Sequence, residues 1–205
     1  MIRLALLALV FPVAGHAQTL DSVYTSYDWA KDCRTLEQDV PPDEAGMGFQ
    51  MICPGPDGMY LMLTDGDARI SMDYGTTQDF GPWESFSTFS SVSDTVKWRR
   101  QALKGEMTPF ATIHRWFVGP SNTPRELLII STVATSPGTE SCMVGFIDTT
   151  NTPDANALAR DVADRYAPGF VCGNARARGF GYVGLDTPVP RRVSPRPKKS
   201  TGEKP

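Results

Sequence analysis

The middle of the chain alternates between apolar runs and short polar breaks, which is the pattern of consecutive β-strands. Four runs rich in β-branched and aromatic residues are expected to be strands: 95–100, 110–118, 126–135 and 141–149. The breaks between them contain glycine, proline or asparagine. They are too short for the crossover that joins parallel strands, which needs a dozen residues or more. The four runs therefore predict an antiparallel meander.

After the fourth run the apolar interval changes to that of a helix. The residues that recur at this interval are Ala155, Leu158, Ala159, Val162 and Tyr166. Thr152 is a suitable N-cap with Pro153 behind it, and Pro168-Gly169 should end the helix. Small alanines in the apolar stripe allow close contact with a sheet. The expected fold class is α+β, an antiparallel β-sheet meander with one main helix packed on it.

The first third of the chain predicts a hairpin over residues 59–75, with its turn at Asp65-Gly66. In the second arm, apolar residues alternate with Ser71 and Asp73, which indicates one face in solvent. Calcium loops also use spaced aspartates, but Asp65, Asp67 and Asp73 match only the start of that pattern. A hairpin turn is the simpler interpretation. Residues 80–94, rich in serine and aromatics, are expected to be irregular.

The two ends of the chain have compositions that differ from the middle. Residues 1–17 contain one arginine, an apolar run of ten residues and small residues before Ala17. This layout is typical of a secretory signal peptide, and the run is about half the ~20 residues of a membrane span. Residues 185–205 are rich in proline and poor in apolar side chains, so a disordered tail is expected. Residues 18–184 would then form a single domain, located in the periplasm or secreted.

Charge is unevenly distributed between an acidic body and this basic tail. Residues 18–94 contain 14 acidic and 3 basic side chains, a net charge of −11, whereas residues 176–205 contain 2 acidic and 8 basic ones, a net charge of +6. Nucleic acid is not expected as a partner, because phosphate contacts need clustered lysines and arginines on the body. The tail is expected to make at most weak contact with an anionic membrane or cell wall.

All four cysteines follow the signal segment: Cys33, Cys53, Cys142 and Cys172. Four cysteines allow three pairings, and an oxidising compartment favours disulfides over free thiols. We expect the sequential pairing, Cys33 with Cys53 and Cys142 with Cys172, the second of which would clamp the helix to the sheet. A zinc site is the alternative, but no C-x-x-C spacing supports it. No cofactor is expected, because the chain lacks the glycine-rich nucleotide-binding motifs.

Three segments together resemble a group of small exported bacterial proteins of unknown function. They are 53–75, which begins CPGPDGMYLMLTDG, 108–117, which reads TPFATIHRWF, and 142–172, which reads CMVGFIDTTNTPDANALARDVADRYAPGFVC. The resemblance covers most of residues 30–175. It implies export, one domain and the layout of the cysteines. It carries over no activity, substrate or site residue.

Candidate chemistry is sparse. His114 is the only histidine after the signal segment, and as a general base it would need an orienting carboxylate and a nucleophile, for which the spacing gives no signal. A small basic patch is the expected binding surface: Lys97, Arg99, His114 and Arg115. Aromatic residues that could line a sugar or peptide groove are more simply explained by core packing. No catalytic residue and no metal ligand is assigned.

The first hypothesis for function is therefore an exported non-enzymatic domain that binds an envelope component or a partner protein. One alternative is a hydrolase-type enzyme that uses His114 as its base. The other is a purely structural or interaction protein that acts through its basic tail. The lack of a paired histidine, carboxylate and nucleophile motif favours the first hypothesis over the hydrolase.

Overall fold

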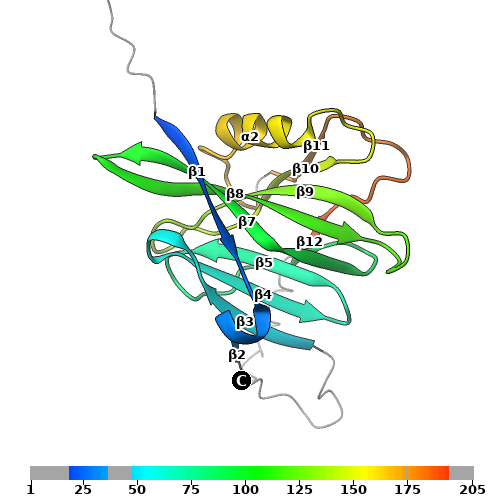
Figure 1. Ribbon diagram of the computed structural model, residues 1–205, viewed down its shortest axis with the longest axis horizontal. Helices are drawn as coiled ribbons and strands as arrows, with labels where there is room; N and C mark the ends of the chain where they lie inside the picture. Colours follow the sequence, from blue (N-terminus) through cyan, green and yellow to red (C-terminus); the bar gives the residue numbers. More distant parts are fainter. Residues whose placement is uncertain (1–18, 37–47, 174, 194–205) are drawn as a thin grey trace, which may run out of the picture.

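The computed structural model describes residues 19–36, 48–173 and 175–193, and they form three layers (Figure 1). One helix, α2 (Ala155–Tyr166), covers one face of a six-stranded sheet. A four-stranded sheet lies on the other face. The expected fold class is confirmed in its coarse form, because the chain is mostly β-sheet with one main helix. The expectation of a single, purely antiparallel sheet is not confirmed.

The six-stranded sheet contains the meander that the sequence predicts. Its strands, in spatial order, are β1 (Leu20–Ser26), β7 (Ser90–Leu103), β8 (Glu106–Val118), β9 (Arg125–Thr132), β10 (Met143–Asp148) and β11 (Arg178–Phe180). Neighbours from β1 to β10 pair antiparallel, while β11 pairs parallel to β10. The sheet is therefore mixed, because the chain returns to β10 through α2 and runs in the same direction. Two strands lie within the segment 80–94 that was expected to be irregular, β6 (Glu84–Ser85) and the first five residues of β7, so the expectation is wrong over both.

The four-stranded sheet comes from the first third of the chain and is antiparallel throughout. Its strands, in order, are β2 (Arg34–Leu36), β3 (Gly48–Pro54), β4 (Tyr60–Gly66) and β5 (Ile70–Gly75). The predicted hairpin is β4–β5, but its tight turn lies two residues later than the predicted Asp65-Gly66, at Asp67 and Ala68, which both have positive φ. A short α1 (Trp29–Asp32) and a 3₁₀ turn, η1 (Pro56–Gly58), complete this part of the chain.

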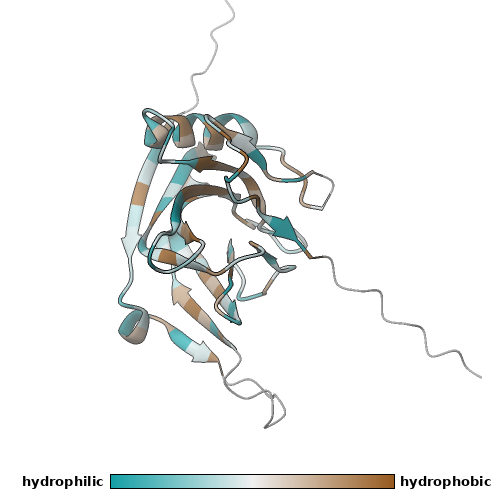
Figure 2. Ribbon diagram, turned by 90° about the vertical axis from the view of Figure 1, so that its right-hand side faces the viewer, coloured by the Kyte–Doolittle hydropathy of each residue, from teal (hydrophilic) through white to brown (hydrophobic). Residues whose placement is uncertain are grey.

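The main core lies between the two sheets. Leu61, Leu63 and Tyr74 of the small sheet meet Trp98 and Trp116 of the large one, and each is at most 4% exposed. The apolar colouring of the strands gathers between the layers (Figure 2). The alternation within each strand thus sends every second side chain into this core.

A second core lies between the large sheet and α2. Ala159, Val162 and Ala163 contact Leu128 and Ile130 from β9. These alanines are fully buried and let the helix lie close to the strands, as the sequence predicts. The helix begins later than expected, with Asp154 rather than Thr152 as the N-cap residue and no side-chain capping bond.

An ion pair under α2 also fixes the helix to the sheet. Both Arg99 nitrogens Nε and Nη2 donate to the Asp164 carboxylate, at 2.8 and 2.7 Å. The third nitrogen, Nη1, donates to the backbone oxygen of Asp21 and to Ser22 on β1. Every nitrogen of this buried guanidinium thereby makes at least one hydrogen bond, so Arg99 joins β1, β7 and α2.

Two disulfides are present in the sequential pairing. Cys33 and Cys53 join the segment after α1 to β3, with Cα atoms 4.3 Å apart. Cys142 and Cys172 lie just before β10 and after α2, with Cα atoms 5.8 Å apart. The second bond closes a loop of 30 residues that contains the whole helix. It therefore clamps α2 to the sheet, as expected.

Replacing Cys142 and Cys172 together with serine should lower the free energy of unfolding by about 3 kcal/mol, because the cross-link restricts the unfolded chain. Urea denaturation of the oxidised proteins measures this loss. The matched control is the double serine variant of Cys33 and Cys53, whose loop of 20 residues predicts a slightly smaller loss. An unchanged unfolding midpoint for the first variant would refute the clamp.

The expected start of the tail at Leu185 is too early. Thr187 is buried, and its hydroxyl donates to Asp148 at 3.2 Å. A short strand, β12 (Arg191–Arg192), pairs antiparallel with β6 (Glu84–Ser85), and the Val193 amide donates to the Trp83 carbonyl at 2.8 Å. The composition does not predict an ordered segment here, because hydrogen bonds and ion pairs fix it in place rather than apolar burial. The remaining predicted tail, 194–205, and the predicted signal segment lie outside the described residues.

Candidate functional site

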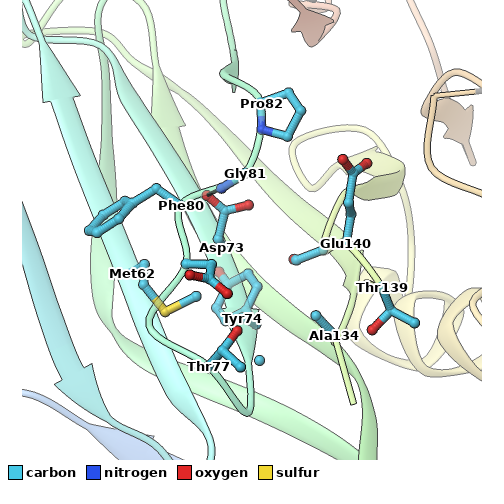
Figure 3. Close-up of a pocket in the computed structure, with 13 residues that line it drawn as sticks. Met62, Asp73, Tyr74, Thr77, Phe80, Gly81, Pro82, Ala134, Thr139 and Glu140 are labelled. Carbon is cyan, nitrogen blue, oxygen red and sulfur yellow. Dashed lines mark hydrogen bonds between the residues drawn. The ribbon is translucent and has the colours of Figure 1, made fainter. Parts of the chain in front are cut away.

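A cleft of about 350 Å³ opens where the edge of the small sheet meets the connection between β9 and β10 (Figure 3). One wall is β5 together with the segment that follows it. The opposite wall is the stretch from Ala134 to Ser141. Its lining residues are Met62, Asp73, Tyr74, Gly75, Thr77, Asp79, Phe80, Gly81, Pro82, Ala134, Thr139, Glu140 and Ser141.

Backbone hydrogen bonds between the two sheets fix the position of these walls. The Ala134 amide donates to the Tyr74 carbonyl at 2.8 Å, and the Thr76 amide donates to the Ala134 carbonyl at 2.9 Å. Gly75 and Ala134 form an isolated bridge, and a methyl group on Gly75 would lie 2.9 Å from the Ala134 oxygen. The close approach requires glycine at position 75. The cleft is thus bounded by backbone on both sides.

Asp73 lies at the centre of the cleft and is buried. It points away from the main core, beside its cross-strand neighbour Met62. The segment after β5 folds back over it, and the Gly81 amide donates to Asp73 Oδ2 at 3.0 Å. A methyl group on Gly81 would lie 2.6 Å from Asp73 Oδ1, so glycine is needed here for the backbone to approach the carboxyl group. Only 6% of Asp73 remains exposed.

This burial changes the protonation of Asp73. Desolvation raises its pKa from 3.8 to about 7, and the nearby carboxylates of Glu84 and Glu140 act in the same direction. The Gly81 amide and the Arg192 guanidinium oppose the shift but do not cancel it. A carboxyl group with such a pKa is partly protonated near neutral pH, so it can either donate or accept a hydrogen bond.

A network of charges lies behind Asp73. Glu84 on β6 accepts a hydrogen bond from the Met143 amide at 2.7 Å, and burial raises the pKa of its carboxyl group. Arg192 on β12 donates to Glu140 at 2.6 Å. Its other terminal nitrogen is 3.7 Å from Glu84. One guanidinium therefore lies between two of the carboxyl groups that act on Asp73.

The alternation of apolar residues with Ser71 and Asp73 predicted that Asp73 lies on a solvent-facing side of its strand. The structure shows that face covered, with Ser71 and Asp73 both buried. Asp65 instead accepts from the Ala68 amide in the hairpin turn, and Asp67 pairs with Arg69. The three aspartates therefore do not converge. In the described part of the chain, no group of three or more metal-ligating side chains is found.

His114 is buried in the main core, with 1% of its surface exposed. Its Nδ1 lies 2.9 Å from the Tyr74 hydroxyl, and its Nε2 lies 2.8 Å from the Ser93 carbonyl oxygen. Because a carbonyl oxygen only accepts, Nε2 carries the proton and Nδ1 accepts from Tyr74. Burial lowers the pKa of His114 to about 4. Both ring nitrogens are occupied, which removes the geometric basis for His114 as a hydrolytic base.

The structure also separates the four residues of the expected basic patch. Arg99 is buried beneath α2, and His114 faces the opposite side of the sheet. Only Lys97 and Arg115 remain together, lining a shallow groove with Arg160 of α2. Arg115 is paired with Glu126, and Lys97 lies over the Tyr24 ring, 5.1 Å from its centroid. The patch is therefore smaller than expected, and the charge of Arg115 is balanced by Glu126.

Comparisons of the chain with protein-family models, with curated proteins and with solved structures found no match. No helix in the described ranges is long and apolar enough to cross a bilayer. The cleft around Asp73 and the chemistry of its lining are therefore the basis for a functional proposal.

Proposed function

We propose that the protein is an exported, non-enzymatic binding domain whose Asp73 cleft takes up a small amine-bearing ligand from the cell envelope. The observation that carries the proposal is the buried, partly protonated carboxyl group of Asp73 in a cleft. A carboxyl group in a cleft whose pKa is strongly shifted by burial is a candidate functional site. The two disulfides are consistent with a periplasmic or extracellular protein.

The charge of the lining favours a cation. Asp73, Asp79 and Glu140 contribute three carboxyl groups, of which Glu140 is paired with Arg192, and none of the described residues that line the cleft is basic. In a site partly shielded from water, carboxylates attract an ammonium group more strongly than they would in bulk solvent. An anionic ligand would meet repulsion from the same side chains.

The size and the remaining lining limit the rest of the ligand. A volume of about 350 Å³ is near the lower end of the range for small-molecule sites, about 300–1,000 Å³. Met62, Phe80 and Ala134 supply apolar contacts, while Thr77 and Thr139 supply hydroxyl groups. These features suit a short hydrocarbon chain or ring with one amine group.

Calorimetry with 1,4-diaminobutane and butylamine as probes tests this function. Near pH 7, binding of an ammonium group should displace the proton of Asp73, so the measured heat should depend on the ionisation enthalpy of the buffer. 1,4-Butanediol, which has no charge, should bind at least about tenfold more weakly.

The Asp73→Asn variant should bind the amines at least about tenfold more weakly and should release no proton. The matched control is Asp161→Asn, which removes a half-exposed carboxylate on α2 that pairs with Arg165. Equal binding by the two variants, or a preference for the diol, would contradict the proposal.

A further inference from the structure

A second cavity, of about 320 Å³, lies where the C-terminal segment returns to β6 and β10. Three arginines line it: Arg176 before β11, and Arg191 and Arg192 on β12. Strand β12 is the hydrophilic arrow that precedes the C-terminal grey trace in Figure 2. Pairing of β12 with β6 places these side chains beside Glu84.

Arg192 has a donor without an acceptor. Its Nη1 is buried and makes no hydrogen bond within the described residues. Oε1 of Glu84 is 3.7 Å from it, beyond hydrogen-bond distance, and the hydrogen bond to Glu140 comes from Nη2. A buried donor that lacks an acceptor is costly, and such groups are rare in folded proteins. This nitrogen therefore indicates an acceptor that the described protein atoms do not supply.

The charge of the cavity indicates that this acceptor is an anion. Arg176 and Arg191 are exposed and make no ion pair within the described ranges. Glu84 is the only carboxyl group among the described residues that line the cavity. Its Oε2 is already held by the Met143 amide. Arg192 is shared between Glu140 and Glu84, which leaves Arg176 and Arg191 without a carboxylate partner among the described residues.

We propose that this cavity binds an oxyanion, a phosphate or a carboxylate group, through Arg176, Arg191 and the free nitrogen of Arg192. The planar guanidinium fork matches the spacing of oxygens in both groups, and charge-assisted hydrogen bonds are the strongest of their kind. This site takes ligands of opposite charge to those of the Asp73 cleft. It therefore does not depend on the function proposed for that cleft.

Titration of the full mature protein with inorganic phosphate and with acetate at constant ionic strength tests the site, with calorimetry as the readout. The Arg176→Gln/Arg191→Gln variant keeps the buried Arg192 network and should bind at least about tenfold more weakly. Arg192→Lys keeps the charge but loses the fork, and should also weaken binding. The matched control is Arg165→Gln, an exposed arginine on α2 whose loss should leave binding unchanged.

A second arm identifies the source of the anion. Vesicles of phosphatidylglycerol present the phosphate on a membrane, whereas inorganic phosphate presents it free in solution. Binding to the vesicles or to inorganic phosphate that is lost in the double glutamine variant supports the site. The probe that binds then shows whether the anion comes from a membrane or from solution. Absence of binding in both arms, or equal binding by the glutamine variant and the Arg165 control, overturns the proposal.

Discussion

Replacing Asp73 with asparagine should raise the free energy of unfolding by about 4 kcal/mol at pH 8 and leave it almost unchanged at pH 4. The folded pKa of Asp73 is about 7, whereas its ordinary value is 3.8. Between these values the folded state binds a proton that the unfolded state has released. The stability that this proton supplies is complete below pH 3.8 and is lost as the pH rises through 7. Three pKa units at about 1.4 kcal/mol each give the estimate.

Asparagine avoids this loss because it is always neutral. Its side-chain oxygen can still accept the hydrogen bond from the Gly81 amide, so the local geometry is retained. Urea denaturation at pH 4, 6 and 8 measures the effect. The control Asp161→Asn removes a half-exposed carboxylate and should change stability by less than about 0.5 kcal/mol. If the Asp73 variant is less stable by the same amount at every pH, the proton is not involved.

A gain of stability in this variant would also bear on function. Residues that lower stability are retained where a binding site needs them, because the favourable contact forms only with the ligand. Under the proposed function, the ammonium group of the ligand would lie beside Asp73 and would stabilise its charged carboxylate. The same substitution should then increase stability and abolish amine binding.

The parts of the fold that the sequence predicts are those fixed by local spacing. The meander follows from short breaks between apolar runs, and the helix follows from its apolar stripe with Pro168-Gly169 behind it. The disulfide of Cys142 and Cys172 follows from both, because a helix that packs back on its preceding strand brings the segment after the helix beside the start of that strand. None of these predictions needs contacts between distant segments.

The parts that the sequence does not predict depend on contacts between distant segments. Asp73 reads as solvent-facing because its neighbours alternate, and only the segment folded over it through Gly81 buries it. Arg99 reads as part of a patch because nothing local shows that Asp164, 65 residues later, lies over it. The parallel pairing of β11 requires the return path of the chain after α2.

His114 illustrates the same limit within a single strand. The alternation in β8 correctly separates it from Arg115, but the pattern alone does not say which face of the sheet is covered by a second sheet. Tyr74, whose hydroxyl donates to His114, is 40 residues away on the small sheet. A lone histidine in a strand therefore carried no information on its access to solvent.

In the Asp73→Asn background, lowering the pH from 6.5 to 4 should reduce the free energy of unfolding by about 3 kcal/mol through His114. Its folded pKa is about 4 and its ordinary value is 6.5, so within this window the unfolded state binds the proton. The stability is complete above pH 6.5 and is lost as the pH falls through 4. The groups that act on the ring are the Ser93 carbonyl and Asp94, which oppose the shift, and burial exceeds both.

The Asp73 background matters because the two buried groups act in opposite directions over the same range. As the pH falls from 6.5 to 4, protonation of Asp73 stabilises the wild-type fold while protonation of His114 destabilises it, so the wild-type profile should be nearly flat.

Adding His114→Gln to the Asp73 variant should remove the acid slope, whatever it does to the overall stability, since glutamine does not titrate. Glutamine can accept from Tyr74 and donate to the Ser93 carbonyl, which makes it the closest uncharged replacement. A slope that persists in this double variant would assign the acid sensitivity to other groups and would show that His114 accepts its proton without unfolding the core.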